Sequence, residues 1–334
     1  MRRFTAKIVI LITLILSGWW WIATSSLQNN LMAWLDARRS EGWQADVGDM
    51  SRVGFPLRIA STLSDTAIAD PETALALNIP QFTLSTPIYW PGHVTLTLPA
   101  EPIVISTQQG AVTISSDGAQ AALRLHPGTS LQLEALTAAS TDLSFDLVEG
   151  RILSVQTLQA NVEQGLEPET YNIDLAATGF APGSVIRQSL RLPAAWPETF
   201  ETLIADMTVT FDRPWDRSAL ETHRPQPRAI TVEQVTAIWA DLSITFGADL
   251  QIEPNGTASG TANLQAHNWQ RMLDLASAGG ALSPQARPQA ESILNLLSGL
   301  SGNAETLDVE ITIDKGRMRM GFIPLGNAPR IILR

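Results

Sequence analysis

Residues 307–313, LDVEITI, alternate apolar and polar side chains without a break. A period of two is typical of a β-strand with one buried face, because successive side chains of a strand point to opposite sides of the sheet. Residues 242–246, LSITF, repeat the pattern, and similar runs recur along most of the chain. Turn-forming pairs separate the runs, among them Pro91-Gly92 and Asp117-Gly118. The short spacing leaves no room for long helices, so the sequence predicts antiparallel strands joined by hairpins.

The predicted fold class is mainly β, with roughly 13–16 strands in the alternating runs. We expect an antiparallel β-rich body over residues 42–334, in the form of a curled sheet, a groove or a sandwich. Residues 223–228 form a proline-rich connection and the best candidate domain boundary. Strands resume directly after it, which favours one continuous β-body. Helical insertions near 182–221 and 268–300 are expected to hold four short helices, at about 182–191, 212–221, 268–279 (N-capped by Asn268) and 284–300.

The N-terminus carries an apolar segment with the features of a membrane anchor. Basic residues precede it, and residues 8–23 hold an apolar run followed by three successive tryptophans. As a helix these residues span about 24 Å, and adding residues 4–7 brings the segment near the ~20 residues that a bilayer requires. We expect a transmembrane signal anchor in residues 1–23 that enters the membrane through residues 4–23. The side chains expected at the membrane interface are Lys7, Trp19, Trp20 and Trp21.

Two alternatives to an anchor remain open at this stage. A cleaved signal peptide requires small residues before the cut, which places the cut after Ala23 or Ser25. A buried core helix is the second alternative. The basic side chains before the segment favour a cytoplasmic N-terminus and a body on the other side of the membrane.

A helical period continues past the apolar segment. It predicts a juxtamembrane helix over residues 24–41, which ends before Gly42 and packs an apolar stripe on the first strands. A flexible stalk is the alternative. The stripe consists of Leu27, Leu31, Trp34, Leu35 and Arg38.

Charge and composition argue against several classes of function. The net charge of −11 disfavours a basic nucleic-acid-binding surface, and the absence of cysteine excludes disulfides, thiolate metal sites and a cysteine nucleophile. No phosphate-binding loop, GxSxG motif or SxxK motif is present. We expect no enzyme, no cofactor and no metal site, because the four histidines stand apart from one another and from acidic clusters. They are His93, His126, His223 and His267.

The strands offer more apolar surface than the few expected helices can cover. Either the strands cover one another in a closed core, or they curl into a trough whose inner face is left for a ligand such as an acyl chain. Alternation alone favours the closed core, since any half-buried strand alternates. If the trough exists, the candidate lipid-facing residues are Leu96, Leu123, Leu133, Phe145, Leu242 and Ile244.

One short element is more specific than the alternation. Residues 52–58 read RVGFPLR, and looser motifs follow at residues 89–94, 213–217 and 314–326. Together with the N-terminal segment, these motifs resemble the alphaproteobacterial domain-of-unknown-function family 2125 over nearly the whole chain. The sharpest positions are Gly54, Phe55, Pro56 and Arg58. Pro56 fixes its own φ and favours an extended Phe55, so the same residues also fit an ordinary bulge at the first strand.

The resemblance implies a relationship to the AsmA-like envelope proteins, which are anchored in the bacterial inner membrane and form β-rich grooves. It implies a single-pass protein with a periplasmic body and a role in phospholipid transfer or envelope assembly. It brings no catalytic residues. Two functions therefore stay open: a lipid-handling protein with a hydrophobic β-groove, and a non-enzymatic scaffold with a closed β core that binds other envelope proteins.

Overall fold

The computed structural model describes residues 2–71, 73–194, 196–221, 224–280, 282–300 and 305–333. The chain divides into two compact units. Unit 1 comprises Met1–Leu125 and Ala138–Val148, and unit 2 comprises His126–Thr137 and Glu149–Arg334. The division differs from the candidate boundary at residues 223–228, which lies inside unit 2 and is described only from residue 224. Strands hold 53% of the residues and pair antiparallel, which confirms the predicted mainly β class.

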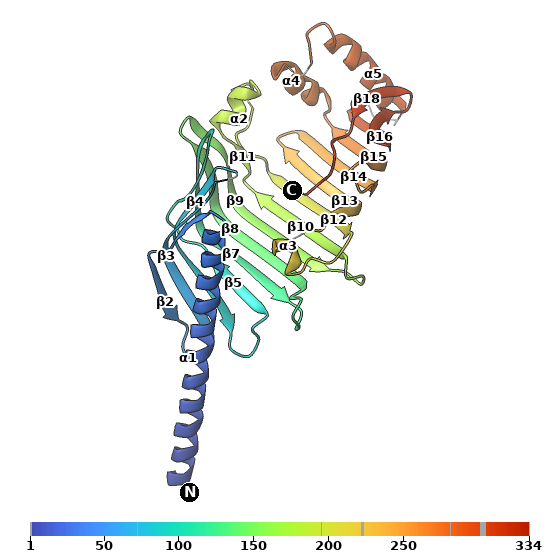
Figure 1. Ribbon diagram of the computed structural model, residues 1–334. Helices are drawn as coiled ribbons and strands as arrows, with labels where there is room; N and C mark the ends of the chain where they lie inside the picture. The colour runs from blue at the N-terminus through green and yellow to red at the C-terminus, as the bar shows by residue number, and fades with distance from the viewer. Residues whose placement is uncertain are drawn as a thin grey trace. The chain divides into compact units, whose positions relative to one another are not determined.

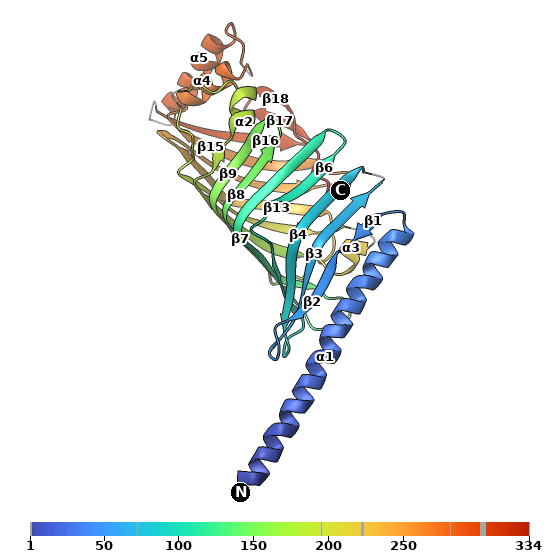
Figure 2. The same ribbon diagram turned by 90° about the vertical axis from the view of Figure 1, so that its left-hand side faces the viewer.

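A single helix, α1, covers Arg2–Ser40 and therefore includes both helical segments predicted at the N-terminus. In Figures 1 and 2 its N-terminal half extends beyond the ends of strands β2 and β3, and its C-terminal half lies along them. Leu35 of the predicted stripe is buried, whereas Trp34 is exposed. Within the described residues, no helix is both long enough and apolar enough to cross a membrane.

In unit 1, β3 is the central strand and pairs antiparallel with β1, β2 and β4. β4 continues to both β5 and β6, and these two strands pair with β7. Figure 2 shows α1, β2, β3 and β4 side by side. The strands are β1 Gln44–Asp46, β2 Asp49–Val53, β3 Arg58–Asp70, β4 Leu75–Pro87, β5 His93–Thr97, β6 Ile103–Thr107, β7 Gly110–Leu125 and β8 Leu133–Leu147, the last of which lies partly in each unit.

The register of unit 1 separates a polar from an apolar face. Thr62, Thr83 and Thr97 are directly paired across β3, β4 and β5, and the hydroxyls of the first two are 2.9 Å apart. The neighbouring row on the opposite face comprises Ser61, Leu84 and Leu96. Helix α1 lies on this second face.

In unit 2 the strands follow one another as antiparallel neighbours, except that β10 pairs with both β9 and β12 while the two-residue β11 pairs with β9. The ladder then runs from β12 to β18 in sequence order. The strands are β9 Gly150–Gln164, β10 Thr170–Thr178, β11 Ala181–Pro182, β12 Thr202–Phe211, β13 Pro227–Trp239, β14 Leu242–Ile252, β15 Ala258–His267, β16 Thr306–Asp314, β17 Arg317–Met320 and β18 Ile323–Asn327.

One face of this ladder is apolar from β9 to β16. Directly paired residues share a face, and each successive partner in the central row is apolar. This row comprises Ala160, Leu175, Ala205, Val235, Phe246, Leu264 and Val309. The adjacent row on the opposite face is polar from β13 to β16, where it comprises Thr236, Thr245, Gln265 and Asp308. On β10 and β12 the same row continues through Ala176 and Ile204.

Short helices occur where helical insertions were predicted, but each of the four begins later than expected. The helix predicted over 212–221 is reduced to α3, Ser218–Glu221. The Asp212 carboxylate accepts the Gln226 N–H at 2.9 Å, which ties residue 212 to the start of β13 instead of a helix. The other helices are α2 Ser184–Ser189, α4 Gln270–Ala278 and α5 Arg287–Leu300.

The prediction that Asn268 caps α4 is wrong. Asn268 has a φ of +57° and donates from Nδ2 to the Asp241 carbonyl at 2.6 Å. Helix α4 begins after Trp269 without a side-chain cap. The amide of Asn268 thus closes the β14–β15 end of the sheet instead of the helix.

The turn predicted at Asp117-Gly118 is also wrong, because both residues lie inside β7. Gly118 has a φ of +70°, a conformation that glycine adopts without the penalty of a Cβ. The Thr141 hydroxyl of β8 donates to the Asp117 carbonyl, so the irregular position is still satisfied. A sequence signal for a turn therefore marks an irregularity within a long strand.

Tyr171 anchors one end of the apolar face in unit 2. Its ring packs with Val209 and Phe211, and its side chain is 1% exposed. The hydroxyl accepts the Trp215 N–H at 3.0 Å and donates to the Leu133 carbonyl at 3.4 Å. Burial raises the pKa of this phenol.

We predict that Tyr171→Phe lowers the free energy of unfolding by about 1–3 kcal/mol, because the half-buried Trp215 N–H loses its acceptor. The matched control is Tyr89→Phe, whose side chain is 80% exposed and which should leave stability unchanged. Denaturant unfolding of both variants measures the difference. Equal stability of the two variants would contradict the assigned hydrogen bonds.

The same tyrosine predicts a stability change in alkali. Its folded pKa lies above its unfolded value of about 10, so the unfolded chain releases the proton first. The contribution of the neutral Tyr171 side chain to the free energy of unfolding is fully present below pH ~10 and is lost as the pH rises through the folded pKa. Melting temperatures should therefore fall more steeply above pH ~10 in the parent than in Tyr171→Phe.

Candidate functional site

The first candidate site lies where α1 meets the beginning of β3. Trp20 of α1 donates its indole N–H to the Arg58 carbonyl at 2.6 Å, and its ring meets the Phe55 ring edge-on at 5.3 Å between centroids. Two of the motif residues Gly54, Phe55, Pro56 and Arg58, namely Phe55 and Arg58, thus contact one tryptophan of the predicted interface. Sequence analysis singled out both groups but did not predict that they touch.

Gln28 and Arg52 extend this contact along the helix. Gln28 donates to the Ser61 hydroxyl at 3.1 Å and accepts from Arg52 Nε at 2.9 Å. The Arg52 guanidinium also lies 5.8 Å from the centroid of the Trp21 ring. Gln28 was not predicted, although it stands two helical turns after Trp20, where a residue of the same helix face is expected.

The turn between β4 and β5 adjoins the motif. Residues Arg58 and Pro87 are paired, and the Ile88 N–H donates to the Leu57 carbonyl at 3.0 Å. This brings Tyr89 and Trp90 to the same end of unit 1. Several large side chains remain open to solvent here, with exposed fractions of 55% for Phe55, 66% for Leu57, 80% for Tyr89 and 42% for Trp90.

The residues predicted to lie at a membrane interface occupy one stretch of α1. Trp19 and Trp21 are exposed, whereas Trp20 is half-buried against the motif. Lys7 lies within the helix, and its side chain is outside the described set. Their placement at a membrane stays a prediction.

The second candidate site is the apolar strand face. In unit 1, Leu96 and Leu123 share the face on which Ser61 and α1 lie, since Leu123 pairs with Val94 two residues before Leu96. Both are half-buried, as is Phe145 on β8. Its neighbour in the strand, Ser144, is buried, and the Ser144 hydroxyl donates to the Asp146 carboxylate at 3.0 Å.

In unit 2 the protein itself covers part of the predicted lipid-facing set. Leu242 is 3% exposed in a cluster with Trp196 and Trp239, and Ile244 packs against this cluster. Leu133 packs against the Tyr171 cluster. By contrast, Leu175, Val235, Phe246 and Leu264 of the central row are only half-buried, although Ala205 and Val309 of the same row are buried. This row was not among the predicted residues, because its coherence depends on register and not on any single strand.

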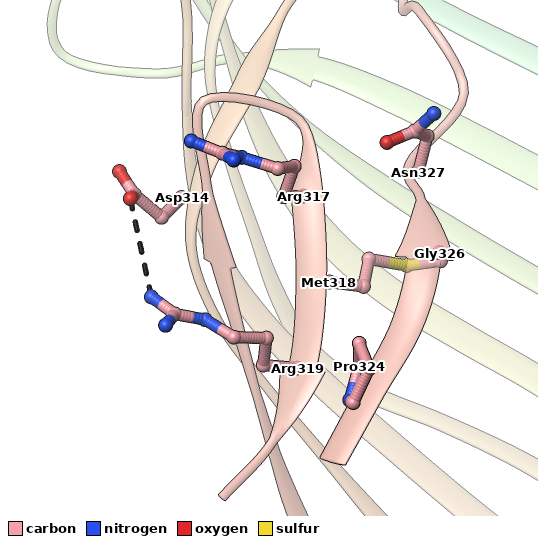
Figure 3. Close-up of a pocket in the computed structure, with 7 residues that line it drawn as sticks. All are labelled: Asp314, Arg317, Met318, Arg319, Pro324, Gly326 and Asn327. Atoms are coloured by element: carbon pink, nitrogen blue, oxygen red, sulfur yellow. Dashed lines mark ion pairs between the residues drawn. The ribbon is translucent and has the colours of Figure 1, made fainter. Parts of the chain in front are cut away.

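Two cavities are lined by strand residues. One of about 460 Å³ in unit 2 is lined by β16–β18, and Figure 3 shows Asp314, Arg317 and Arg319 on one side of it, with an ion pair of 4.0 Å between Asp314 and Arg319. The other, of about 360 Å³ in unit 1, is lined by residues of β1, β3, β4 and β6. The first holds opposed charges beside the apolar side chains of Met318 and Pro324.

The described residues contain no group of three or more histidine, cysteine, aspartate or glutamate side chains suited to a metal ion. His126 is instead within 2.7 Å of the Gln164 amide oxygen, where it joins the segment before β8 to the end of β9 within unit 2. His223 lies outside the described residues. The two candidate sites therefore consist of apolar strand faces and exposed aromatic side chains, which are suited to binding an apolar ligand or partner.

A long N-terminal helix joined to an antiparallel, mainly β body defines the structural class of this protein. The chain matches the family described as "Uncharacterized protein conserved in bacteria (DUF2125)" over residues 20–329, and it belongs to that family. The matched range begins at Trp20 and includes the whole Gly54–Arg58 motif. A comparison with curated proteins found no match.

We predict that Gly54→Ala destabilises the junction with α1. A Cβ there would lie 2.9 Å from both Cβ and the carbonyl oxygen of Arg58, the acceptor of the Trp20 hydrogen bond. Gly42→Ala is the matched control, since φ is +93° at Gly42 and +91° at Gly54, but no atom lies within 4 Å of a Cβ at Gly42.

Both alanines incur the left-handed backbone cost of about 1 kcal/mol, and only Gly54→Ala adds the steric conflict. Calorimetric melting of both variants should therefore show the larger loss for Gly54→Ala. Equal losses would argue against a tight Gly54–Arg58 contact.

Proposed function

We propose that this chain is a membrane-anchored protein of the bacterial envelope that binds phospholipid acyl chains on the apolar face of its β-body. The observation that carries the proposal is the register of unit 2, which aligns apolar side chains from β9 to β16 while the adjacent row faces the other way and is polar from β13 to β16. Ordinary half-buried strands need an apolar partner layer on such a face.

The central row supports a ligand because protein covers it incompletely. Leu175, Phe246 and Leu264 are half-buried, whereas both ends of the face hold buried clusters. An acyl chain placed along this row would gain roughly 0.8 kcal/mol for each methylene removed from water. About ten buried methylenes would therefore contribute on the order of 8 kcal/mol before the cost of ordering the chain.

The proposed anchor is the N-terminal segment of α1. Its support is the apolar run from Ile8, the basic residues before it and the tryptophans after it. On this proposal the protein is single-pass in the inner membrane, with a cytoplasmic N-terminus and a periplasmic body. The resemblance to AsmA-like envelope proteins supports the same placement and the link to phospholipid.

The second candidate function is a non-enzymatic scaffold that binds other envelope proteins. The buried clusters favour it, because Trp269, Leu307 and Val309 pack together under α4 and α5 as a closed core. A closed core of this kind resembles an ordinary protein interior and requires no lipid.

Strand β14 provides a matched test of the two functions. Leu242 and Phe246 lie on the same face of this strand, the first buried and the second half-buried. Leu242→Glu should unfold the protein, because an unpaired buried charge costs several kcal/mol of a total near 5–15. In a lipid-binding protein, Phe246→Glu should keep the parent melting temperature and lose co-purified phospholipid. Native mass spectrometry of detergent-extracted protein measures the lipid.

Thr245→Glu is the control for charge on the same strand, since Thr245 faces the polar side opposite Gln265. It should change neither the fold nor the lipid content. An unfolded Phe246→Glu variant, or a parent protein that never carries lipid, favours the scaffold.

The proposed topology has its own test. Alkaline phosphatase fused after Arg334 should be active, because the enzyme requires an oxidising compartment to form its disulfides. The N-terminal sequence of the membrane-extracted protein should begin at or near Met1. A mature protein that starts near Thr24 or Ser26 would identify a cleaved signal peptide instead.

A further inference from the structure

A group of exposed apolar side chains gathers at one end of unit 1. We call it the aromatic collar and define it by Trp19, Trp21, Phe55, Leu57, Tyr89 and Trp90. Three separate segments contribute: α1, the β2–β3 turn and the β4–β5 turn. The Trp20–Phe55 contact joins the first two segments, and the Ile88–Leu57 hydrogen bond joins the last two. The collar residues therefore belong to three segments that are held together at one end of unit 1.

The collar continues directly into the exposed side of α1. Leu14 is 65% exposed, Ile15 61% and Trp19 54%, so apolar surface extends from the projecting half of the helix onto the turns. Single exposed apolar residues are common, but a continuous apolar surface marks an interaction site.

The composition of the collar indicates which partner it fits. Tryptophan and tyrosine combine an apolar ring with one polar hydrogen-bond donor, and such residues are favoured where hydrocarbon meets water. Arg52 and Arg58 stand exposed beside the rings. They place positive charge next to the collar of a chain whose net charge is −11. Aromatic rings with adjacent arginines match the headgroup layer of an anionic bilayer.

The length of α1 before Trp20 matches the distance from one side of a bilayer to the headgroup layer on the other side. The helix begins at Arg2, and Trp20 hydrogen-bonds to Arg58 at the start of β3. Residues 2–19 span about 27 Å at about 1.5 Å per residue, close to the ~30 Å thickness of a bilayer hydrocarbon core. A helix that crosses the bilayer up to Trp19 brings Phe55, Leu57 and Tyr89 to the opposite headgroup layer.

We propose that the aromatic collar is a membrane-contact surface additional to the helical anchor, and that it inserts into the headgroup layer of a phospholipid bilayer. The depth argument rests on the anchor proposed above. The collar fixes the ends of β3 and β4 against the membrane. It thereby holds the α1-facing strand face of unit 1 next to the lipid.

The absence of cysteine makes the test direct, because a single introduced thiol can be labelled at will. The full-length chain would be reconstituted in vesicles of phosphatidylethanolamine and phosphatidylglycerol. An environment-sensitive fluorophore would be attached, one position at a time, through Leu16→Cys, Leu57→Cys, Tyr89→Cys or Val148→Cys. Leu16 reports on the anchor, and Leu57 and Tyr89 report on the collar.

Val148 is the matched control. It is apolar and 92% exposed, and it follows the end of β8 that lies away from the collar. The proposal expects a blue-shifted emission and protection from aqueous iodide at positions 16, 57 and 89, with full quenching at position 148. Adding Leu57→Asp to the Tyr89→Cys protein should remove the protection at position 89 without changing the melting temperature.

The remaining outcomes separate the two proposals. Protection at position 16 with quenching at 57 and 89 as strong as at 148 overturns the collar and leaves the anchor. Protection at 57 and 89 without protection at 16 supports the collar as a peripheral contact and overturns the anchor. Quenching at all four positions overturns both.

Discussion

Strand register is the constraint on which the β-body depends. Each residue of a strand faces the same way as its direct partner, so a slip of one residue would turn a whole strand over. From β9 to β16 every pairing keeps Leu175, Phe246 and their partners on one side and Gln265 and its neighbours on the other. The buried clusters at both ends of this apolar face depend on the same alignment. Tyr171 reinforces it at one end, because its hydroxyl bonds to backbone groups of two other segments.

The alternation of residues such as 307–313 was sufficient to predict the strand class, since period two reports local burial. It was not sufficient to predict strand lengths. Irregular positions inside strands resemble turns in the sequence: Gly118 lies within β7, and Asp65 within β3 has a φ of +49°. Cross-strand partners decide between a turn and an irregular strand, and those partners are distant in sequence. The helix predicted at residues 212–221 was shortened for the same reason, as Asp212 bonds to Gln226.

The candidate sites were predictable in part. The tryptophans and the Gly54–Arg58 motif stand out as local patterns, but their contact joins residues 38 positions apart and cannot be read from either pattern. Apolar alternation identified Leu242 as one of an inward-facing set, yet could not distinguish a residue covered by Trp196 and Trp239 from one left half-open like Phe246. That distinction depends on which loop folds over which row.

The contacts of α1 also have a mechanical consequence. Trp20, Gln28 and Arg39 each hydrogen-bond to the strands of unit 1, at Arg58, Ser61 and Ala45 respectively. Three fixed points along one side prevent a helix from rolling about its own axis. The 39-residue helix is about 58 Å long, and its free half acts as a lever arm on the half that is held. Any force that tilts the free half is therefore delivered as torque to β3, the central strand of unit 1.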